Sequence, residues 1–229
     1  MGEAKRLRRA ELAKLIDHTA LGPAVTPERV KELCAEAVRY DFFAVCVNPC
    51  HVALAKRELR DTAVKVATVI GFPHGATLPE VKAFEARAAV DAGADELDMV
   101  INVAALQQKD YRAVHEEIAA VREAVAKAPR RILLKVILET ALLDESGKVA
   151  GAIIAQAAGA DFVKTSTGFG PGGATVEDVK LLRSTVGPGM GVKAAGGIRD
   201  YETAIAMVAA GANRIGTSSG VAIIQGAPE

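Results

Sequence analysis

Short β-like runs alternate with longer helical stretches along the chain, and this alternation constrains the fold more than any other feature. We expect strands at residues 15–17, 42–47, 65–70, 96–101, 132–138, 162–166, 191–195 and 214–217. Between them lie stretches with the apolar spacing of helices, for example residues 79–91, 111–126 and 201–210. Eight strands that are each followed by a helix are typical of a closed (β/α)8 barrel.

A weak internal repeat supports the same fold. The segments "DAGADELDMV", "AAGADFVKTS" and "AAGANRIGTS" each end a predicted helix with glycine and then begin a strand. Glycine after a helix takes the left-handed conformation that other residues resist. An open doubly wound sheet is the alternative, but no G-x-G-x-x-G follows the first strand. We therefore predict an α/β protein with one TIM-barrel domain over residues 1–229 and a short N-terminal helix.

The charge balance argues against several classes of protein. Lys and Arg together number 28, Asp and Glu together number 28, and the formal net charge is zero. A nucleic-acid partner would require a clustered basic surface, and the basic cluster at residues 5–9 fits one face of the short helix instead. The N-terminal region lacks a long apolar segment, so we expect neither a signal peptide nor contact with a membrane.

The three cysteines, Cys34, Cys46 and Cys50, are too few and too irregularly spaced for a disulfide framework. We therefore expect a cytoplasmic protein. Cys46, Cys50 and His51 are spaced closely enough to suggest metal ligands, but no second cluster completes such a site. We expect no metal and no cofactor.

Three lysines lie near the carboxyl ends of predicted strands, where barrel enzymes concentrate their chemistry. Lys135, Lys164 and Lys193 recur at intervals of one strand–helix unit, so similar positions on three neighbouring strands are expected. Crowding and burial both disfavour an ammonium group. At least one lysine should then be a neutral amine, which is a good nucleophile toward a carbonyl carbon. The alternative is that each lysine reaches the rim or pairs with a carboxylate, and the spacing does not identify the nucleophile.

Glycine-rich segments follow the last strands. "KAAGGIRD" and "GTSSG" come after the seventh and eighth, where this fold commonly binds phosphate. Glycines let backbone N–H groups approach an anion closely, although simple tight turns would have the same composition. The predicted phosphate ligands are Gly168 of "GFGPGG", which follows strand six, and Gly196, Gly197, Gly216, Ser218 and Ser219.

Asp98 is the predicted inward-facing carboxylate of "ELDMV", because Leu97 and Met99 should face the outer helices. A buried carboxylate is costly unless it pairs or accepts hydrogen bonds. The lysines are its expected partners, and its role is either structural or in proton transfer. Asp17 invites the same two interpretations, with the structural one favoured. His18, His51 and His74 lack metal-ligand spacing and are expected to be structural.

Taken together, these segments resemble the deoxyribose-phosphate aldolase family. The resemblance rests on "LIDHTAL", "VCVNP", "VIGFPHG", "ELDMVIN", "LLKVILET", "ADFVKTSTGF", "VKAAGGIR" and "IGTSSG", which occur in order from about residue 10 to 222. It implies a class I aldolase that needs no metal. The implied reaction is reversible cleavage of 2-deoxy-D-ribose 5-phosphate to D-glyceraldehyde 3-phosphate and acetaldehyde, in the breakdown of deoxyribonucleosides.

The resemblance also implies roles for individual residues. Lys164 of "VKTSTG" would be the Schiff-base nucleophile, and Lys193 of "VKAAGG" would lower its pKa and exchange protons. Asp98 would relay protons through a water molecule. The supporting residues are expected to be Lys135, Asp17, Thr167 and Cys46.

Two other functions fit the same sequence features. One is a different phosphate-binding barrel enzyme, such as a transaldolase-like enzyme or an isomerase, and the other is a sugar-phosphate binder without activity. The expected partners are a small sugar phosphate and aldehydes. On the family's pattern, we also expect a homodimer or homotetramer.

Overall fold

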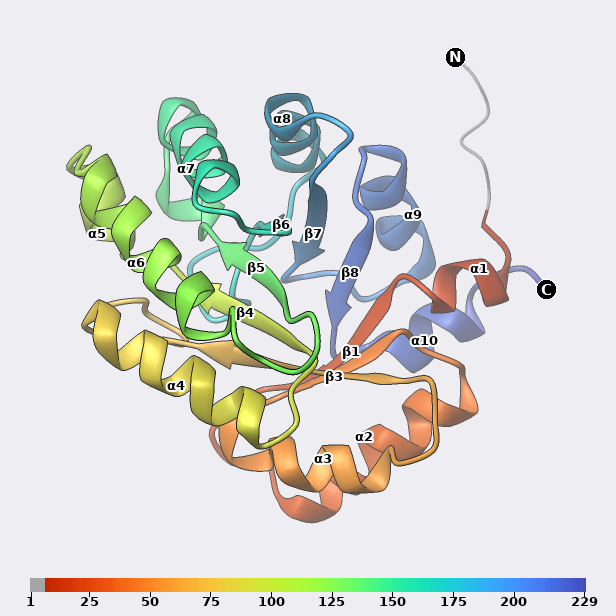
Figure 1. Ribbon diagram of the computed structural model, residues 1–229. Helices are drawn as coiled ribbons and strands as arrows, with labels where there is room; N and C mark the ends of the chain where they lie inside the picture. Colours follow the sequence, from red (N-terminus) through yellow and green to blue (C-terminus); the bar gives the residue numbers. More distant parts are fainter. Residues whose placement is uncertain (1–6) are drawn as a thin grey trace.

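The computed structural model describes residues 7–229, and this part of the chain forms a closed barrel of eight parallel strands in sequence order (Figure 1). The barrel, rather than the open sheet, is therefore the fold. The strands are β1 Ile16–Ala20, β2 Ala44–Val47, β3 Lys65–Ile70, β4 Glu96–Val100, β5 Leu133–Ile137, β6 Phe162–Lys164, β7 Gly191–Ala195 and β8 Arg214–Thr217.

Helices surround the barrel on its outer face (Figure 1). They are α1 Arg9–Ala13, α2 Pro27–Arg39, α3 Val52–Glu58, α4 Pro79–Asp91, α5 Val103–Gln107, α6 Tyr111–Ala124, α7 Glu145–Ala157, α8 Val176–Val186, α9 Tyr201–Ala209 and α10 Gly220–Gln225, with 3-10 turns η1 Pro49–His51 and η2 Thr140–Leu142. Within the described residues, no helix combines the length and apolar character that a membrane span requires.

Local sequence signals fix several of these helices. Thr26 caps α2 by accepting a hydrogen bond from the backbone N–H of Arg29, and Pro27 occupies the first helical position. Thr175 caps α8 in the same way. The expected N-terminal helix exists as α1, but it begins only at Arg9. Most of the basic cluster therefore precedes it, and Lys5 and Arg6 lie outside the described residues.

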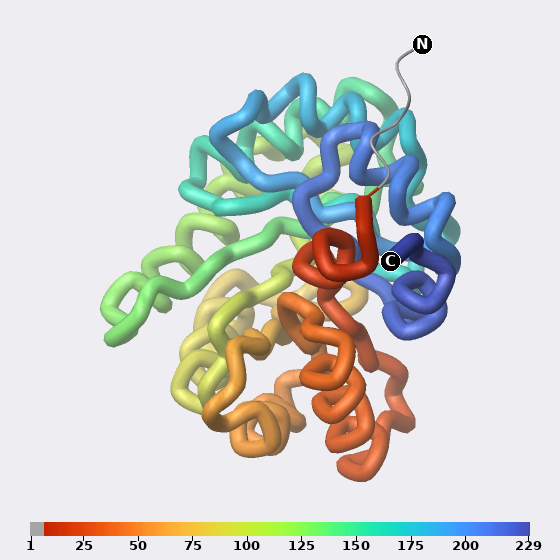
Figure 2. The backbone as a smooth tube through the Cα atoms, turned by 90° about the vertical axis from the view of Figure 1, so that its right-hand side faces the viewer, coloured from red at the N-terminus to blue at the C-terminus, as the bar shows by residue number. Residues whose placement is uncertain are grey.

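Helix α1 and the C-terminal segment lie together on one side of the barrel. Figure 2 shows the C-terminus next to α1. The backbone N–H of Arg9 donates to the carbonyl of Pro228 at 2.9 Å, and the Arg9 side chain donates to the carbonyl of Ile224 at 3.1 Å. These bonds dock α1 against the C-terminal segment that follows β8.

Alternation along each strand divides the molecule into an outer apolar layer and a charged interior. Leu97 and Met99 of β4 face the helices in the main core, as predicted, whereas Asp98 faces inward and is fully buried. A second, small apolar cluster includes Cys46, Ala67 and Val69. Barrels of this fold usually fill their interior with layers of bulky apolar side chains. Here much of that space holds charged side chains instead.

The strands are staggered, and this corrects one prediction. Lys164 is the direct register partner of Lys193, as its spacing predicted, but Lys135 pairs with Phe162 and lies two residues lower than Lys164. The reason is that strands of a closed barrel tilt and shift in register around the axis. Asp17 likewise lies near the start of β1, which continues to Ala20 rather than ending at residue 17.

Candidate active site

The barrel interior holds a chain of buried ion pairs that starts at Asp98. Its Oδ2 atom accepts a hydrogen bond from Nζ of Lys193 at 2.7 Å. Lys193 also donates to Oδ2 of Asp17 at 2.5 Å. The second oxygen of Asp17 accepts from Nη1 of Arg214 at 2.8 Å. Each of these four side chains is at least 94% buried, so the contacts are shielded from water.

The same chain of contacts returns to Asp98 through β4 and β5. Arg214 Nη1 lies 3.0 Å from Oε2 of Glu96. Nζ of Lys135 lies 2.7 Å from the same Glu96 oxygen and donates to Oδ1 of Asp98 at 2.6 Å. The contacts therefore close into a loop of alternating charges. We call this loop the charge ring, and its members are Asp98, Lys193, Asp17, Arg214, Glu96 and Lys135.

Lys164 lies outside the charge ring. Its Nζ donates to Oδ2 of Asp98 at 2.9 Å, and among the described residues this is its one ion pair. The ring itself contains three carboxylates and three cations, so its formal charges cancel. Protonation of Lys164 would add a positive charge that no further carboxylate balances, in a site where the residue is only 3% exposed.

The pKa directions agree with this arrangement. Burial lowers the pKa of Lys164 below its usual value; Asp98 opposes that shift and Lys193 reinforces it. Burial alone would also lower the pKa of Lys193 and that of Lys135, but the carboxylates on both sides of each lysine raise these two pKa values above their usual range. Lys164 is therefore the lysine that most readily becomes a neutral amine.

Both inward aspartates are held as carboxylates. Burial would raise the pKa of Asp98, but Lys135, Lys164 and Lys193 together hold it well below the usual value. For Asp17, burial is likewise outweighed by Lys193 and Arg214, and its pKa is also low.

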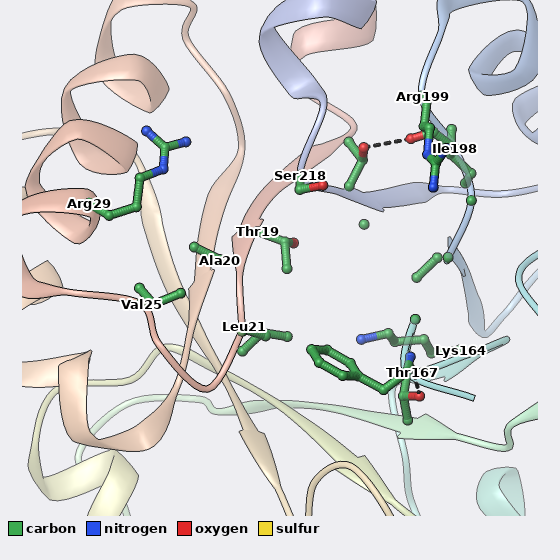
Figure 3. Close-up of a pocket in the computed structure, with 18 residues that line it drawn as sticks. Thr19, Ala20, Leu21, Val25, Arg29, Lys164, Thr167, Ile198, Arg199 and Ser218 are labelled. Carbon is green, nitrogen blue, oxygen red and sulfur yellow. Dashed lines mark hydrogen bonds between the residues drawn. The ribbon is translucent and has the colours of Figure 1, made fainter. Parts of the chain in front are cut away.

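A cavity of about 410 Å³ opens above the lysines at the carboxyl ends of the strands, within the size range of small-molecule sites. Lys164 and Thr167 lie on one side of it, and Ser218 and Arg199 lie on another (Figure 3). The predicted residues that line the cavity are Lys164, Thr167, Gly168, Gly196, Gly197, Gly216 and Ser218.

Other predicted residues lie elsewhere. Ser219 does not line the cavity, and its backbone N–H donates to the hydroxyl of Thr217 at 2.9 Å. Cys46 does not line the cavity; it is buried in the small apolar cluster, and burial raises the pKa of its thiol to about 11. Gly216 has an additional structural role, because a Cβ there would lie 2.9 Å from Cε of Lys193.

The glycine-rich loop after β6 is held at both ends. A Cβ at Gly170 would lie 2.8 Å from the carboxyl carbon of Glu139, and one at Gly173 would lie 2.3 Å from the carbonyl oxygen of Gly196. Within the loop, Phe169 packs edge-on against Phe72 with 5.3 Å between ring centroids. The loop thus adds an aromatic wall to the mouth, as well as the expected glycines.

Several residues of the site were not predicted. Arg199 follows the two glycines of "GGIRD" and lines the cavity, as do Arg29 and Phe169. Glu96 and Arg214 complete the charge ring. A period of two along β4 and β8 places them on the inward face with Asp98 and Gly216, and that signal was available in the sequence.

Two of the histidines that were expected to be structural, His18 and His51, have hydrogen-bond partners. His18 Nε2 lies 2.7 Å from Oε2 of Glu36, and His51 Nε2 lies 3.1 Å from the carbonyl oxygen of Val25. Over residues 7–229, no group of three or more His, Cys, Asp or Glu side chains is placed to hold a metal ion.

Comparison with known proteins shows the family to which the chain belongs. The family model described as DeoC/LacD family aldolase matches residues 12–226. The chain belongs to this aldolase family. Deoxyribose-phosphate aldolase from Thermococcus kodakarensis is 58% identical over 97% of the chain and 100% of the relative. The Streptococcus suis enzyme of the same name is 58% identical over 95% of the chain and 97% of the relative.

Two solved structures named as aldolases share the fold. Deoxyribose phosphate aldolase from Aeropyrum pernix, described as a unique tetramer, superposes with a TM-score of 0.88 at 38% identity, over 96% of this chain and 92% of that one. A structure described as QR15, an aldolase, superposes with a TM-score of 0.88 at 44% identity, over 94% and 95% of the two chains.

Proposed function

We propose that this aldolase cleaves 2-deoxy-D-ribose 5-phosphate reversibly into D-glyceraldehyde 3-phosphate and acetaldehyde through a Schiff base on Lys164. The relatives named for this reaction cover nearly the whole chain. The observation that carries the proposal is the position of Lys164, which adjoins a charge-balanced ring and opens onto the cavity. A neutral amine at that position can attack an aldehyde.

The proposed reaction begins when Nζ of Lys164 attacks C1 of the open-chain sugar phosphate. The carbinolamine takes up a proton, loses water and leaves an iminium cation; the final hydrolysis gives this proton back. This cation accepts the electron pair of the C2–C3 bond as the bond breaks, while the C3 hydroxyl loses its proton and becomes the aldehyde of glyceraldehyde 3-phosphate. The remaining enamine takes a proton at C2, and water then releases acetaldehyde and restores the amine.

Asp98 and Lys193 supply the proposed charges around this chemistry. Asp98 is a carboxylate at rest, so it suits the role of proton acceptor, through a water molecule, for the C3 hydroxyl. Lys193 remains an ammonium between two carboxylates. Its charge disfavours protonation of Lys164 and stabilises negative charge that develops on the substrate oxygen.

The phosphate is proposed to bind at the loops after β7 and β8. Gly197 and Ser218 line that side of the cavity, and the exposed guanidinium of Arg199 supplies a positive charge there. Anchoring the phosphate holds C1 near the amine, and orientation of this kind lowers the barrier by several kcal/mol, on the order of 5.

Product analysis tests this function. Incubation with 2-deoxy-D-ribose 5-phosphate should yield equal amounts of acetaldehyde and glyceraldehyde 3-phosphate, measured with dehydrogenases specific for each product. Arg199→Gln should raise KM for this substrate about 10-fold, since one charge-assisted contact is lost, and should leave KM for unphosphorylated 2-deoxyribose unchanged. An isomerase would instead give a single product of unchanged mass, and a binding protein would give no turnover.

We also propose that the protein is a cytoplasmic homodimer or homotetramer. The Aeropyrum pernix neighbour is described as tetrameric. Exposed apolar side chains on and beside α4, namely Leu78, Val81 and Phe84, offer a surface for a second copy. The three cysteines are too few and too irregularly spaced for a disulfide framework, and this supports a reducing compartment. Light scattering coupled to size-exclusion chromatography tests the assembly.

A further inference from the structure

Glu96 and Arg214 lie at the end of the barrel opposite the cavity. Each is the first residue of its strand, and neither lines the cavity. Both are nearly inaccessible, at 3% and 5% exposure. The Arg214 guanidinium lies 3.6 Å from the ring centroid of Phe43 and 5.6 Å from that of Phe162. A substrate held at the cavity therefore touches neither residue.

Both residues nevertheless connect to Lys164 through the charge ring. Arg214 pairs with Asp17, Asp17 pairs with Lys193, and Lys193 pairs with Asp98. On the other side, Glu96 pairs with Lys135, which also pairs with Asp98. The titratable groups that act on Lys164 are Asp98 from β4, Lys193 from β7 and Cys46 from β2. Behind these groups, Lys135 from β5 pairs with Asp98, and Asp17 from β1 pairs with Lys193.

We propose that Glu96 and Arg214 are positioning residues that together set the pH at which Lys164 becomes a neutral amine, because each supplies one charge of the balanced ring: Arg214 favours the neutral amine and Glu96 opposes it. The inference rests on the proposed Schiff-base function. An uncompensated charge in a dry interior is costly, so the ring's net charge decides how readily Lys164 takes up a proton. Removing a ring anion should disfavour that proton, and removing a ring cation should favour it.

Two charge-removing variants test this with opposite expected signs. Glu96→Gln removes a negative charge, so Lys164 should stay neutral to lower pH. Arg214→Gln removes a positive charge, so Lys164 should become protonated at higher pH. The acid limb is the low-pH side of the plot of acetaldehyde-trapping rate against pH. It should move by about one pH unit, to lower pH in Glu96→Gln and to higher pH in Arg214→Gln. A purely structural role would lower the active fraction in both variants without moving the limb in opposite directions.

The double variant E96Q/R214Q restores a neutral ring, and its acid limb should return to within a few tenths of a pH unit of the native position. The exposed pair on α6 supplies matched controls, because Glu116→Gln and Arg112→Gln remove the same charges from the surface. These two variants should shift the limb by less than about 0.2 pH unit, since exposed charges are screened.

The readout is the rate at which acetaldehyde is trapped on the protein by cyanoborohydride between pH 5 and 9, measured by mass spectrometry. The midpoint of this profile does not depend on how much of a variant is folded, provided that circular dichroism stays constant across the range. Opposite shifts with recovery in the double variant support the proposal. Equal profiles, or shifts of one sign, overturn it. Native protein that traps no acetaldehyde would instead refute the proposed function.

Discussion

Lys164 and Lys135 are both buried, and both donate to Asp98, yet they occupy two different halves of the barrel interior. In the lower half, Lys135 lies between two close carboxylates, Asp98 and Glu96, and its Nζ is 3.9 Å from a third, that of Asp17. In the upper half, Lys164 has the single carboxylate of Asp98 among residues 7–229 and faces the cavity. Burial alone therefore does not make a lysine neutral. The number of carboxylates that share it decides the charge.

Replacing Lys164, the proposed nucleophile, should cause the largest loss of activity. Lys164→Arg keeps a cation, but a guanidinium stays protonated and cannot form the iminium. Cleavage of 2-deoxy-D-ribose 5-phosphate should fall at least about 1,000-fold. Lys65→Arg, at an exposed position at the start of β3, is the matched control and should retain native rates. Substantial turnover by K164R would contradict the assignment of the nucleophile.

Removing Lys193 should have the next largest effect. In Lys193→Met, Asp98 and Asp17 each lose a cation, so Asp98 should hold Lys164 as an ammonium. Because the chemistry needs the neutral amine, the rate falls as pH falls through the Lys164 pKa, and a raised pKa moves that limb upward. We expect about a 100-fold loss of kcat/KM at pH 7, partly recovered by pH 9. A loss of equal size at all pH values would argue against the electrostatic role.

Lys135→Met should have a smaller effect on activity and a clear effect on stability. Lys135 has no direct contact with the cavity, so kcat/KM at pH 7 should fall by about 10-fold through the raised pKa of Lys164. Asp98 and Glu96 lose a close partner and Asp17 loses a longer contact, which should lower the free energy of unfolding by about 3 kcal/mol. Urea denaturation measures this change, and an unchanged midpoint would show that the ring tolerates the missing cation.

Much of the fold could be predicted because each strand and helix carries its own local signal. The residues 65–70, 79–91, 191–195 and 214–217 were bounded correctly, since a glycine, a proline or a change of period marks each end. The prediction was wrong about the position of Lys135 along the barrel axis, which is two residues lower than that of Lys164. The reason is that the stagger of a closed barrel is a property of all eight strands together.

The candidate site was only partly predictable for the same reason. The spacing of the lysines predicts where the chemistry lies, and the resemblance of "VKTSTG" to a known motif is needed to select Lys164 as the proposed nucleophile. The structure adds a physical basis for that selection in the charge ring. Glu96 and Arg214 are separated by more than half of the chain, so their contact across the interior could not be inferred from local pattern.

Trapping of the Schiff base tests the central claim most directly. Native protein is incubated with acetaldehyde and borohydride, digested, and its modified peptides are mapped by mass spectrometry. The charge ring predicts an ethyl group on Lys164, with Lys135 and Lys193 unmodified because both are held as ammonium groups. Modification of Lys135 or Lys193 in place of Lys164, or no modification within the barrel, would contradict the account.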